Sequence, residues 1–307
     1  MFAGFPHILS ATQFSADWLE TVLFPHVQRL KAQGLDKVEQ SLVGKTMATF
    51  FYAPSSRTHS FFRAAMKHLG GEVSFTIELP ILREEPVEYV IDLAIAYRAA
   101  DVILLRRDEE GIAVRIAKRA GTAVINGGDG NNEHPTQALL DAFTLKEALG
   151  EINGISIALS GDLARGREAH SLLYLLSKFS GVRVYLVSSS SLRMPRDILA
   201  YAIERSVPVS EHADLRTVAS EVQVIYQTRI QKERALPGND PEEGESFCRI
   251  DETVLERLGR DAIIMHPLPR NEEIPMWVDA DPRAVYFQQQ LKNDLFVRMA
   301  LLEEILG

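Results

Sequence analysis

The chain has 307 residues, about twice the usual size of a domain, so we expect two domains of roughly 150 residues each. A hydrophobic content of 46% and a charged content of 24% are typical of a globular protein that buries a core without disulfides. The net charge of −9 argues against nucleic acid as a main partner, because phosphate backbones are bound by surplus Lys and Arg. The single cysteine, Cys248, excludes an internal disulfide and any multi-cysteine metal site.

The sequence also bears on membrane partners and location. It has no basic-then-apolar signal pattern near its start and no run of about 18 apolar residues. We therefore expect no membrane partner and a location in the reducing cytoplasm.

In chain order, the first half alternates apolar runs with amphipathic segments. A helix is predicted after Ser15, and residues 46–52 (TMATFFY) have the dense apolar composition of a buried strand. Ser56 can cap the next helix, which ends at the glycine pair 70–71. Two further pairs of a strand and a helix follow, at residues 102–105 and 111–120 and at residues 123–126 and 135–149.

The second half repeats this alternation and ends in an amphipathic helix. The predicted strands are residues 155–160, 182–187, 222–228 and 262–265, and the predicted helices are residues 167–179, 195–205 and 291–306. The polar stretch 237–246 is typical of a loop. Strands that alternate with helices of 10–15 residues predict two doubly wound α/β domains, each a parallel sheet with helices on both faces. We place the boundary at Gly150, giving domains 1–149 and 150–289, with residues 290–307 packing back on the first.

In such folds ligands bind at the carboxyl ends of strands, and polar clusters follow three of the apolar runs. The first cluster is Ser55-Ser56-Arg57-Thr58. Its hydroxyls, its guanidinium and the free N–H groups of a helix start suit a phosphate. The alternative is an ordinary helix cap beside a surface arginine.

The second cluster contains His134 and Gln137, where a histidine can polarise a carbonyl and a glutamine can bind an amide. Its alternative is a loop histidine at a helix start. The third cluster is residues 266–270 (HPLPR), whose prolines leave carbonyls such as those of Pro267 and Leu268 available for an –NH2 group. Its alternative is a rigid turn.

The motifs FYAPSSRT, HPTQALLD, TRIQKER and HPLPR, with Gly161-Asp162 and four residues before Arg167, occur in the order and spacing of aspartate carbamoyltransferase catalytic chains. The chain resembles this family over nearly its whole length, including residues 285–300 near its end. The related ornithine enzymes carry a cysteine in the HPLPR motif, and this chain has none there.

The resemblance implies roles for the residues that match these motifs. The phosphate of carbamoyl phosphate would be held by Ser55, Ser56, Arg57, Thr58 and Arg106. His134 and Thr58 would polarise the carbonyl, Gln137 and the carbonyls of Pro267 and Leu268 would hold the amide, and Arg57, Thr58 and His134 would be catalytic. Arg167, Arg229 and Gln231 would bind the carboxylates of the acceptor, L-aspartate.

The resemblance also implies direct attack of the acceptor amine on the carbamoyl carbon, with no metal and no organic cofactor. It implies a homotrimer whose sites lie between neighbouring chains, and a regulatory or dihydroorotase partner. A dinucleotide-binding enzyme is a weaker alternative, because residues 161–166 (GDLARG) do not form the required glycine pattern. A metal at Asp129 and Glu133 is disfavoured, because no second histidine lies nearby.

One loop departs from the family pattern. Family members carry a serine and a lysine in a loop that reaches a neighbouring active site, whereas residues 78–88 here read ELPILREEPVE. No lysine occurs between Lys67 and Lys118. Three interpretations remain open: Arg83 replaces the lysine in an aspartate enzyme, the acceptor is a different amine that meets Glu84 or Glu85, or the chain is a weak or inactive homologue with a structural or regulatory role.

Overall fold

The computed structural model of the protein describes residues 6–52, 56–78, 86–97, 99–231 and 248–307. The chain divides into two compact units. Unit 1 comprises Met1–Leu140 with Asn293–Gly307, and unit 2 comprises Asp141–Lys292. The division falls inside helix α6 (Pro135–Leu149) rather than at Gly150, and most of the last helix, α10 (Leu291–Leu306), belongs to unit 1.

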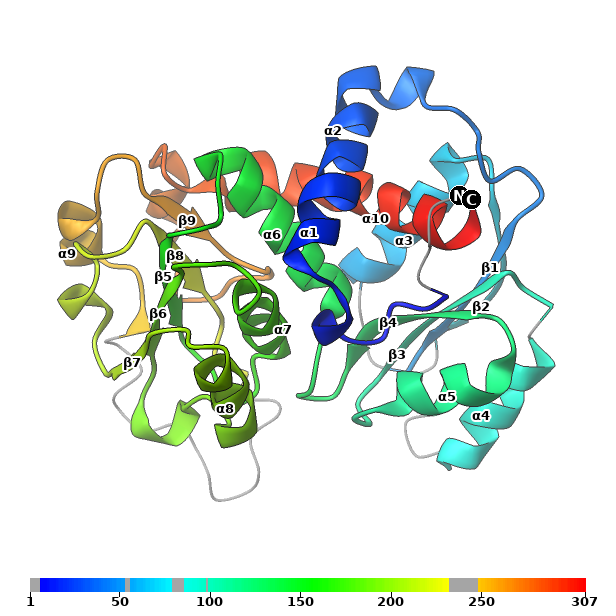
Figure 1. The fold of residues 1–307 in the computed structure, drawn as a ribbon, viewed down its shortest axis with the longest axis horizontal. Helices are drawn as coiled ribbons and strands as arrows, with labels where there is room; N and C mark the ends of the chain where they lie inside the picture. The colour runs from blue at the N-terminus through cyan, green and yellow to red at the C-terminus, as the bar shows by residue number, and fades with distance from the viewer. Residues whose placement is uncertain (1–5, 53–55, 79–85, 98, 232–247) are drawn as a thin grey trace. The chain divides into compact units, whose positions relative to one another are not determined.

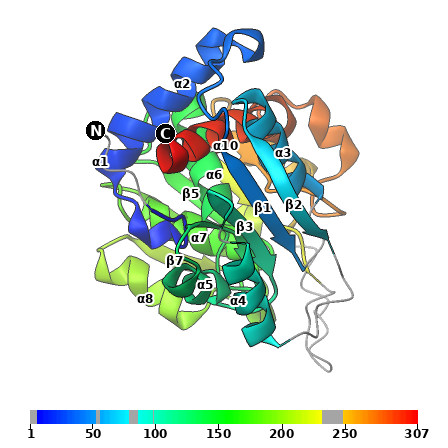
Figure 2. The same cartoon turned by 90° about the vertical axis from the view of Figure 1, so that its right-hand side faces the viewer.

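Within the described residues, unit 1 is built on a parallel sheet of four strands in the order β2-β1-β3-β4. These strands are β1 (Thr46–Phe51), β2 (Glu72–Glu78), β3 (Val102–Arg107) and β4 (Ala123–Asp129). Helices α3 (Ser56–His68) and α10 lie on one face of the sheet, and α4 (Val87–Ala96) and α5 (Ile112–Ala120) lie on the other (Figures 1 and 2).

The strands of unit 1 are apolar on both faces because helices cover both. Ala48, Phe50 and Tyr52 join the cluster that α4 and α5 complete, whereas the alternating Met47, Thr49 and Phe51 are buried outside it. Successive side chains of a strand point to opposite faces, so a doubly covered strand is apolar almost throughout. Each fully buried side chain of this kind contributes about 1.5–3 kcal/mol.

Unit 2 has a five-stranded parallel sheet among its described residues, in the order β7-β6-β5-β8-β9. The strands are β5 (Ser156–Ser160), β6 (Arg183–Val187), β7 (Val209–His212), β8 (Val224–Gln227) and β9 (Ile263–Met265). Helices α7 (Arg167–Leu176) and α8 (Arg196–Glu204) lie on one face and α9 (Glu252–Arg257) on the other (Figure 1). The predicted fold class, two parallel-sheet α/β units with helices on both faces, is confirmed.

The chain starts with helices α1 (Ala16–Trp18) and α2 (Phe24–Gln33), joined by a π-helical segment, Leu19–Leu23. The side chain of Ser15 caps α1, accepting a hydrogen bond from the Trp18 N–H at 3.1 Å, as its position in the sequence predicts. A second π-helical segment, Tyr286–Gln290, precedes α10. Short 3₁₀ helices occur at Ala11–Gln13, Leu35–Lys37, Ser190–Leu192, Leu215–Thr217 and Met276–Ala280.

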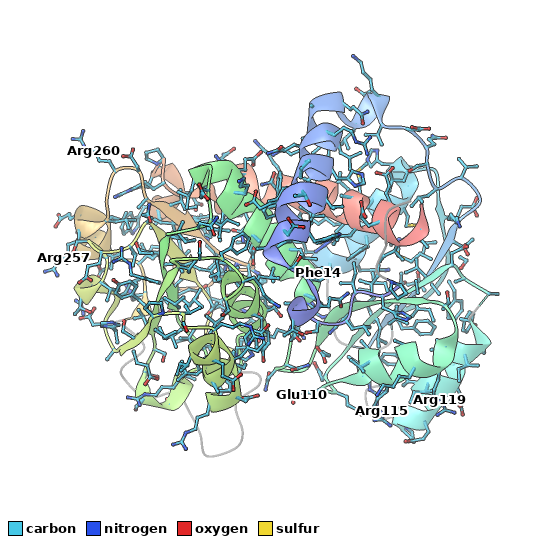
Figure 3. All side chains as sticks on the ribbon, in the orientation of Figure 1. Phe14, Glu110, Arg115, Arg119, Arg257 and Arg260 are labelled. Carbon is cyan, nitrogen blue, oxygen red and sulfur yellow. The ribbon has the colours of Figure 1, made fainter. Side chains whose placement is uncertain are left out.

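Among the described strands and α-helices, β2, α4, β7 and α9 were not predicted. The strand β7 (VSEH) has no buried residue, so it lacks the apolar pattern on which strand prediction depends. Helix α9 has six residues, too few for a clear helical period. Basic side chains such as Arg119 of α5 and Arg257 of α9 complement the negative ends of these helices (Figure 3). The predicted loop 237–246 lies outside the described residues, and no helix among the described residues is long and apolar enough to cross a membrane.

Candidate active site

The strand order of unit 1 places several predicted residues at one point. Strand β1 lies between β2 and β3, so the chain changes direction in the sheet between β1 and β3. In doubly wound sheets a crevice for ligands opens at the carboxyl ends of the strands at such a point. Arg57 and Thr58 lie in the first turn of α3, directly after β1, and Arg106 lies near the end of β3, beside Phe51 of β1.

Contacts join this group to the start of α6. The Thr58 hydroxyl lies 3.3 Å from Nε2 of His134, and Nη2 of Arg57 donates to Oε1 of Gln137 at 3.2 Å. Thr58, His134 and Gln137 are buried, whereas the Arg57 side chain is 24% exposed. Four residues predicted from two separate motifs are therefore in direct contact within unit 1.

The loop before His134 is held by a buried carboxylate, Asp129. Its Oδ1 accepts from Nδ2 of Asn126 at 2.8 Å and its Oδ2 accepts from the Gly111 N–H at 2.7 Å. Gly130 has a φ of +52°, and a Cβ there would lie 2.5 Å from the carbonyl oxygen of Asp108, so this turn requires glycine. Asp129 thus shapes the loop that presents His134.

A second carboxylate and a hydroxyl complete the support of this histidine. Oε2 of Glu133 accepts from the Ala11 N–H at 2.8 Å, so the N-terminal segment contacts the residue before His134. The Thr136 hydroxyl lies 3.3 Å from Nδ1 of His134, so both ring nitrogens face threonine hydroxyls. Asp129 and Glu133 both bind backbone N–H groups, which is a structural use of the carboxylates considered above for a metal.

The other predicted residues of unit 1 are Ser55, Ser56, Arg83 and Arg106. Ser55 and Arg83 lie outside the described residues, and Ser56 is the first residue of α3. Nη1 of Arg106 donates to the Gly127 carbonyl at 3.4 Å, in the strand that leads to the His134 loop. Of the unusual loop, Pro86 is exposed and directly precedes α4.

Unit 2 has a corresponding change of direction, between β5 and β8. Arg167 begins α7 after β5, Arg229 and Gln231 follow β8, and His266 follows β9, the next strand in the sheet. All the predicted residues of this unit therefore come from the carboxyl ends of three neighbouring strands. A Cβ at Gly161, just after β5, would lie 2.2 Å from the Thr228 carbonyl oxygen, so glycine permits this close approach of two strand ends.

The predicted acceptor-binding residues already contact polar groups of unit 2. Arg167 is only 1% exposed, and its Nε lies 3.4 Å from Oε1 of the next residue, Glu168. Gln231 donates through its N–H to Oδ2 of Asp162 at 3.1 Å and through Nε2 to the Arg165 carbonyl at 3.2 Å. Arg229 is half-buried.

His266 fixes the shape of the HPLPR segment. The Leu268 N–H donates to Nδ1 of His266 at 2.7 Å, so Nε2 carries the ring proton and donates to Oε1 of Glu273 at 2.9 Å. Leu268 has a φ of +48°, unusual for a residue with a side chain. Burial has the largest single effect on Glu273 and opposes its ionisation, but the interactions with His266 and the backbone hydrogen bonds of Asn271 and Glu273 together outweigh it and lower the pKa of this carboxyl.

A network of hydrogen bonds through Gln290, Asp141 and Tyr226 also holds the HPLPR segment. The His266 N–H donates to Oε1 of Gln290 at 3.0 Å, and Nε2 of Gln290 donates to Oδ1 of Asp141 at 2.7 Å. The Tyr226 hydroxyl donates to the other Asp141 oxygen at 2.6 Å. Sequence analysis missed Asp141, although one carboxylate inside the apolar run ALLDAF of α6 was a usable signal.

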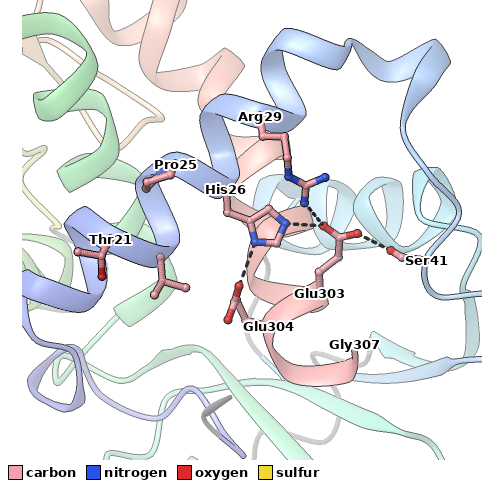
Figure 4. A pocket seen from close by; sticks show the side chains of 9 residues that line it. Thr21, Pro25, His26, Arg29, Ser41, Glu303, Glu304 and Gly307 are labelled. Atoms are coloured by element: carbon pink, nitrogen blue, oxygen red, sulfur yellow. Dashed lines mark hydrogen bonds and ion pairs between the residues drawn. The ribbon is translucent and has the colours of Figure 1, made fainter. Parts of the chain in front are cut away.

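A hollow of about 630 Å³ in unit 1 is separate from these clusters. It is lined by Thr21, Val22, Pro25, His26, Arg29, Ser41, Glu303, Glu304 and Gly307 (Figure 4). None of the predicted site residues that the structure describes lines it. Its charged groups pair with one another, since Nε2 of His26 lies 2.6 Å from Oε2 of Glu303 and Nδ1 lies 3.0 Å from Oε1 of Glu304.

Comparison with known proteins matches both halves of the chain. The aspartate/ornithine carbamoyltransferase model for the carbamoyl-P binding domain matches residues 6–147, and that for the Asp/Orn binding domain matches residues 153–305. The chloroplastic aspartate carbamoyltransferase of Arabidopsis thaliana is 43% identical, over 97% of this chain and 77% of the relative. The aspartate carbamoyltransferase catalytic subunit of Methanocaldococcus jannaschii is 42% identical, over 86% of each chain.

The fold also matches solved structures. Aspartate transcarbamoylase from Trypanosoma cruzi, in complex with carbamoyl phosphate and aspartate, superposes with a TM-score of 0.87 at 35% identity. The match covers 98% of this chain and 97% of that one.

Proposed function

The chain belongs to the aspartate/ornithine carbamoyltransferase family, and we propose that it transfers the carbamoyl group of carbamoyl phosphate to the amino group of L-aspartate. The products are N-carbamoyl-L-aspartate and phosphate. The observation that carries this proposal is a pair of contacts in unit 1, where the chain changes direction in the sheet. Arg57 contacts Gln137, and Thr58 contacts His134. This group combines a cation, hydroxyls, an imidazole and an amide, which are the groups that carbamoyl phosphate requires.

The residues that the family resemblance assigns to carbamoyl phosphate have separate roles in this proposal. Ser55, Ser56, Arg57, Thr58 and Arg106 hold the phosphate, and the start of α3 adds free N–H groups and the positive end of the helix dipole. The amide –NH2 donates to Oε1 of Gln137 and to the carbonyls of Pro267 and Leu268. The fixed HPLPR turn supports the second part of this assignment, because it settles the direction of these carbonyls in advance.

The catalytic step is a direct displacement. The lone pair of the acceptor amine attacks the carbamoyl carbon, and negative charge develops on the carbonyl oxygen. His134 stabilises this oxygen when the Thr136 hydroxyl donates to Nδ1, because Nε2 then carries the proton. Thr58 and Arg57 add further donors. The carbon–oxygen bond to phosphate then breaks, and the phosphate leaves with the proton of the amine. Preorganised donors of this kind lower such barriers without a covalent intermediate.

Arg167, Arg229 and Gln231 bind the two carboxylates of aspartate in this proposal. Arg167 already contacts the carboxylate of Glu168. A carboxylate of aspartate must therefore displace Glu168 from Arg167 or share the guanidinium with it. The lysine that relatives carry in the loop has no counterpart, and losing one preorganised donor typically lowers a rate by about a hundredfold to a thousandfold. We therefore propose an aspartate enzyme of reduced efficiency in which Arg83 partly replaces the lysine.

A second candidate function is carbamoylation of a different, cationic amine. It is favoured by the contact between Glu168 and Arg167, and by the four acidic residues of the loop 78–88. Such an acceptor would place its cationic group against these carboxylates. The third interpretation, a homologue with a structural or regulatory role, predicts binding without turnover.

The homotrimer and the regulatory or dihydroorotase partner are proposed on the family resemblance alone. The cytoplasmic location stays a prediction from the sequence, and the Arabidopsis relative is named as chloroplastic. Light scattering at micromolar concentration tests the trimer, and a stable monomer would contradict it.

A steady-state assay with carbamoyl phosphate and a panel of amines tests the function, alongside calorimetry of carbamoyl phosphate binding at low salt. We expect aspartate to be the preferred acceptor, and Arg57→Ala to weaken carbamoyl phosphate binding by about a hundredfold, as expected for loss of a bidentate cation. Arg115→Ala is the matched control, because this 45% exposed arginine pairs with the surface carboxylates of Glu88 and Glu109. Equal binding by wild type and Arg57→Ala would refute the phosphate site.

A further inference from the structure

A buried carboxylate in the last helix contacts the arginine of the phosphate cluster. Asp294 lies in α10, and its Oδ2 is 3.7 Å from Nε of Arg57. Its other oxygen, Oδ1, is 2.8 Å from Nη1 of Arg298, one turn further along α10. Asp294 is 1% exposed and Arg298 is fully buried, so the carboxylate of Asp294 lies between two guanidiniums inside unit 1.

Arg298 is fixed by aromatic contacts with the helix that carries Arg57. Its guanidinium lies 4.8 Å from the ring centre of Phe62 and 5.9 Å from that of Phe61, both in α3. A guanidinium over an aromatic face is attracted by the ring quadrupole. The carboxylate of Asp294 is thus held in place by a group that itself packs against α3.

The charges of this trio explain why a second arginine is present. A carboxylate paired with Arg57 alone would cancel the positive charge that a phosphate needs. Burial raises the pKa of the Asp294 carboxyl, and the charges of Arg298 and Arg57 oppose that rise. With Asp294 ionised, the two guanidiniums and one carboxylate keep a net charge of plus one. Burying ionic groups is costly, and a lone buried carboxylate beside an anion site would repel the ligand. With Arg298 present, Asp294 can restrain Arg57 while the cluster stays cationic.

The contacts of Arg57 also show which of its atoms are restrained. Its Nε faces Asp294 in α10, and its Nη2 donates to Oε1 of Gln137 in α6. The guanidinium is therefore restrained from two sides before any ligand binds. Ligand binding then costs less conformational entropy of the Arg57 side chain.

We propose that Asp294 is a positioning residue for carbamoyl phosphate binding, holding the Arg57 guanidinium from its Nε side while Arg298 balances the charge of Asp294. The proposal rests on the phosphate role assigned to Arg57 under the proposed function. It brings the C-terminal helix, which carries no residue of the predicted site, into the support of the phosphate cluster.

The test separates orientation from charge. Asp294→Asn alone raises the net charge of the trio, whereas Asp294→Asn with Arg298→Met removes the orienting carboxylate and leaves the net charge at plus one. We expect this charge-balanced variant to bind carbamoyl phosphate, and inorganic phosphate as a second probe, about tenfold more weakly by calorimetry, as for other small losses of preorganisation. Glu304→Gln is the control, because it removes another carboxylate of α10 that contacts His26 and not Arg57.

A lysine background distinguishes positioning from a general structural effect. Lysine binds phosphate as a point charge without a planar fork, so holding it in one orientation matters less. In an Arg57→Lys background we expect the charge-balanced pair to change phosphate affinity by less than about twofold, because two changes that act through one group are not additive. An equal loss in both backgrounds, or unchanged or tighter binding in the charge-balanced variant, would overturn the proposal.

Two further results keep the outcomes distinct. Normal carbamoyl phosphate binding by Arg57→Ala would refute the phosphate role of Arg57, and with it the premise of this proposal. If the charge-balanced variant does not fold, Asp294→Glu replaces it, because this change keeps all three charges and only moves the carboxylate. For a folded Asp294→Glu we expect about threefold weaker binding, again through loss of preorganisation; wild-type affinity would contradict the positioning role.

Discussion

The two units carry their candidate residues at the same kind of place but hold them in different ways. In unit 1 the predicted residues contact one another, as Thr58 contacts His134 and Arg57 contacts Gln137. In unit 2 two of the predicted residues, Arg167 and Gln231, contact carboxylates that were not predicted as site residues. Asp162 binds Gln231 and Glu168 contacts Arg167.

This difference indicates where selectivity lies. A cluster of a cation, hydroxyls and an imidazole is already complementary to a phosphate and a carbonyl, so unit 1 suits one fixed ligand. In unit 2 a carboxylate already contacts Arg167, so an acceptor must compete for the cation or use the carboxylate. We therefore expect changes in unit 1 to affect binding of carbamoyl phosphate, and changes in unit 2 to affect the choice of acceptor.

The greatest loss of activity is expected from a change at Arg83, which lies in the sequence between β2 and α4. If Arg83 replaces the missing lysine, Arg83→Ala lowers the rate of aspartate carbamoylation by about a hundredfold, as for loss of a preorganised donor. Binding of carbamoyl phosphate, which we propose is held by the Arg57 cluster, should change much less. Steady-state kinetics and calorimetry measure both, with the exposed Arg63→Ala as control.

The reverse change in this loop decides among the three interpretations. Leu82→Ser with Pro86→Lys should raise aspartate activity above wild type, because it restores the serine and lysine of the family. A cationic acceptor predicts instead that this variant loses its native activity, and that Glu84→Gln or Glu85→Gln lowers it. An inactive homologue predicts no effect of Arg83→Ala and no turnover of any amine.

Glu273 tests whether the HPLPR turn is as preformed as the unit 1 cluster. Glu273→Ala removes the acceptor of the His266 Nε2 proton, so the ring can turn and the Leu268 N–H loses its partner. We expect kcat/KM for carbamoyl phosphate to fall about tenfold, within the range for misplacing a binding group. The exposed neighbour Glu272→Ala is the matched control, and equal effects of both changes would argue against the positioning role.

A change at Glu168 tests whether unit 2 selects the acceptor. Glu168→Gln removes the negative charge 3.4 Å from Nε of Arg167, so aspartate no longer competes with it. For an aspartate enzyme we expect the KM for aspartate to fall about threefold, equivalent to less than about 1 kcal/mol. A rise in KM for the native acceptor would instead support a cationic amine. Glu256→Gln, in exposed α9, is the control.

The smallest effect is expected for His26, and it is an effect on the stability of unit 1 rather than on ligand binding. Burial opposes protonation of His26, but hydrogen bonds with Glu303 and Glu304 outweigh it and raise its pKa above 6.5. A raised folded-state pKa gives stability that is fully present below pH 6.5 and is lost as pH rises through the folded value. His26→Gln should therefore lower the Tm at pH 5.5 by about 2–4 °C, corresponding to roughly 1 kcal/mol, and by less at pH 8.5.

A matched histidine shows whether this pH dependence belongs to the carboxylate contacts. His212→Gln removes a ring that contacts the Ser210 hydroxyl rather than a carboxylate. Measuring the Tm of both variants at pH 5.5 and pH 8.5 separates the carboxylate contacts of His26 from the general loss of a histidine ring. If His26→Gln lowers the Tm more at pH 8.5 than at pH 5.5, the assigned direction of the His26 pKa shift is wrong.

The sequence alone determined the fold class and most strands and helices of both units, because doubly covered strands are apolar throughout and helices have a clear period. It also indicated which residues follow the strand ends, where polar groups interrupt apolar runs. It could not indicate β7 or α9, which are too polar or too short for a period.

Only the tertiary structure decided which of these residues meet and what holds them. The sequence marks Gly150 as the end of a helix, but contacts divide the units inside α6, because one continuous helix contributes to both. It shows Asp294 and Arg298 as ordinary charges one helical turn apart. Their burial beside Arg57 depends on how α10 packs against α3, which brings together residues far apart in the chain. Local composition carries no information about such contacts.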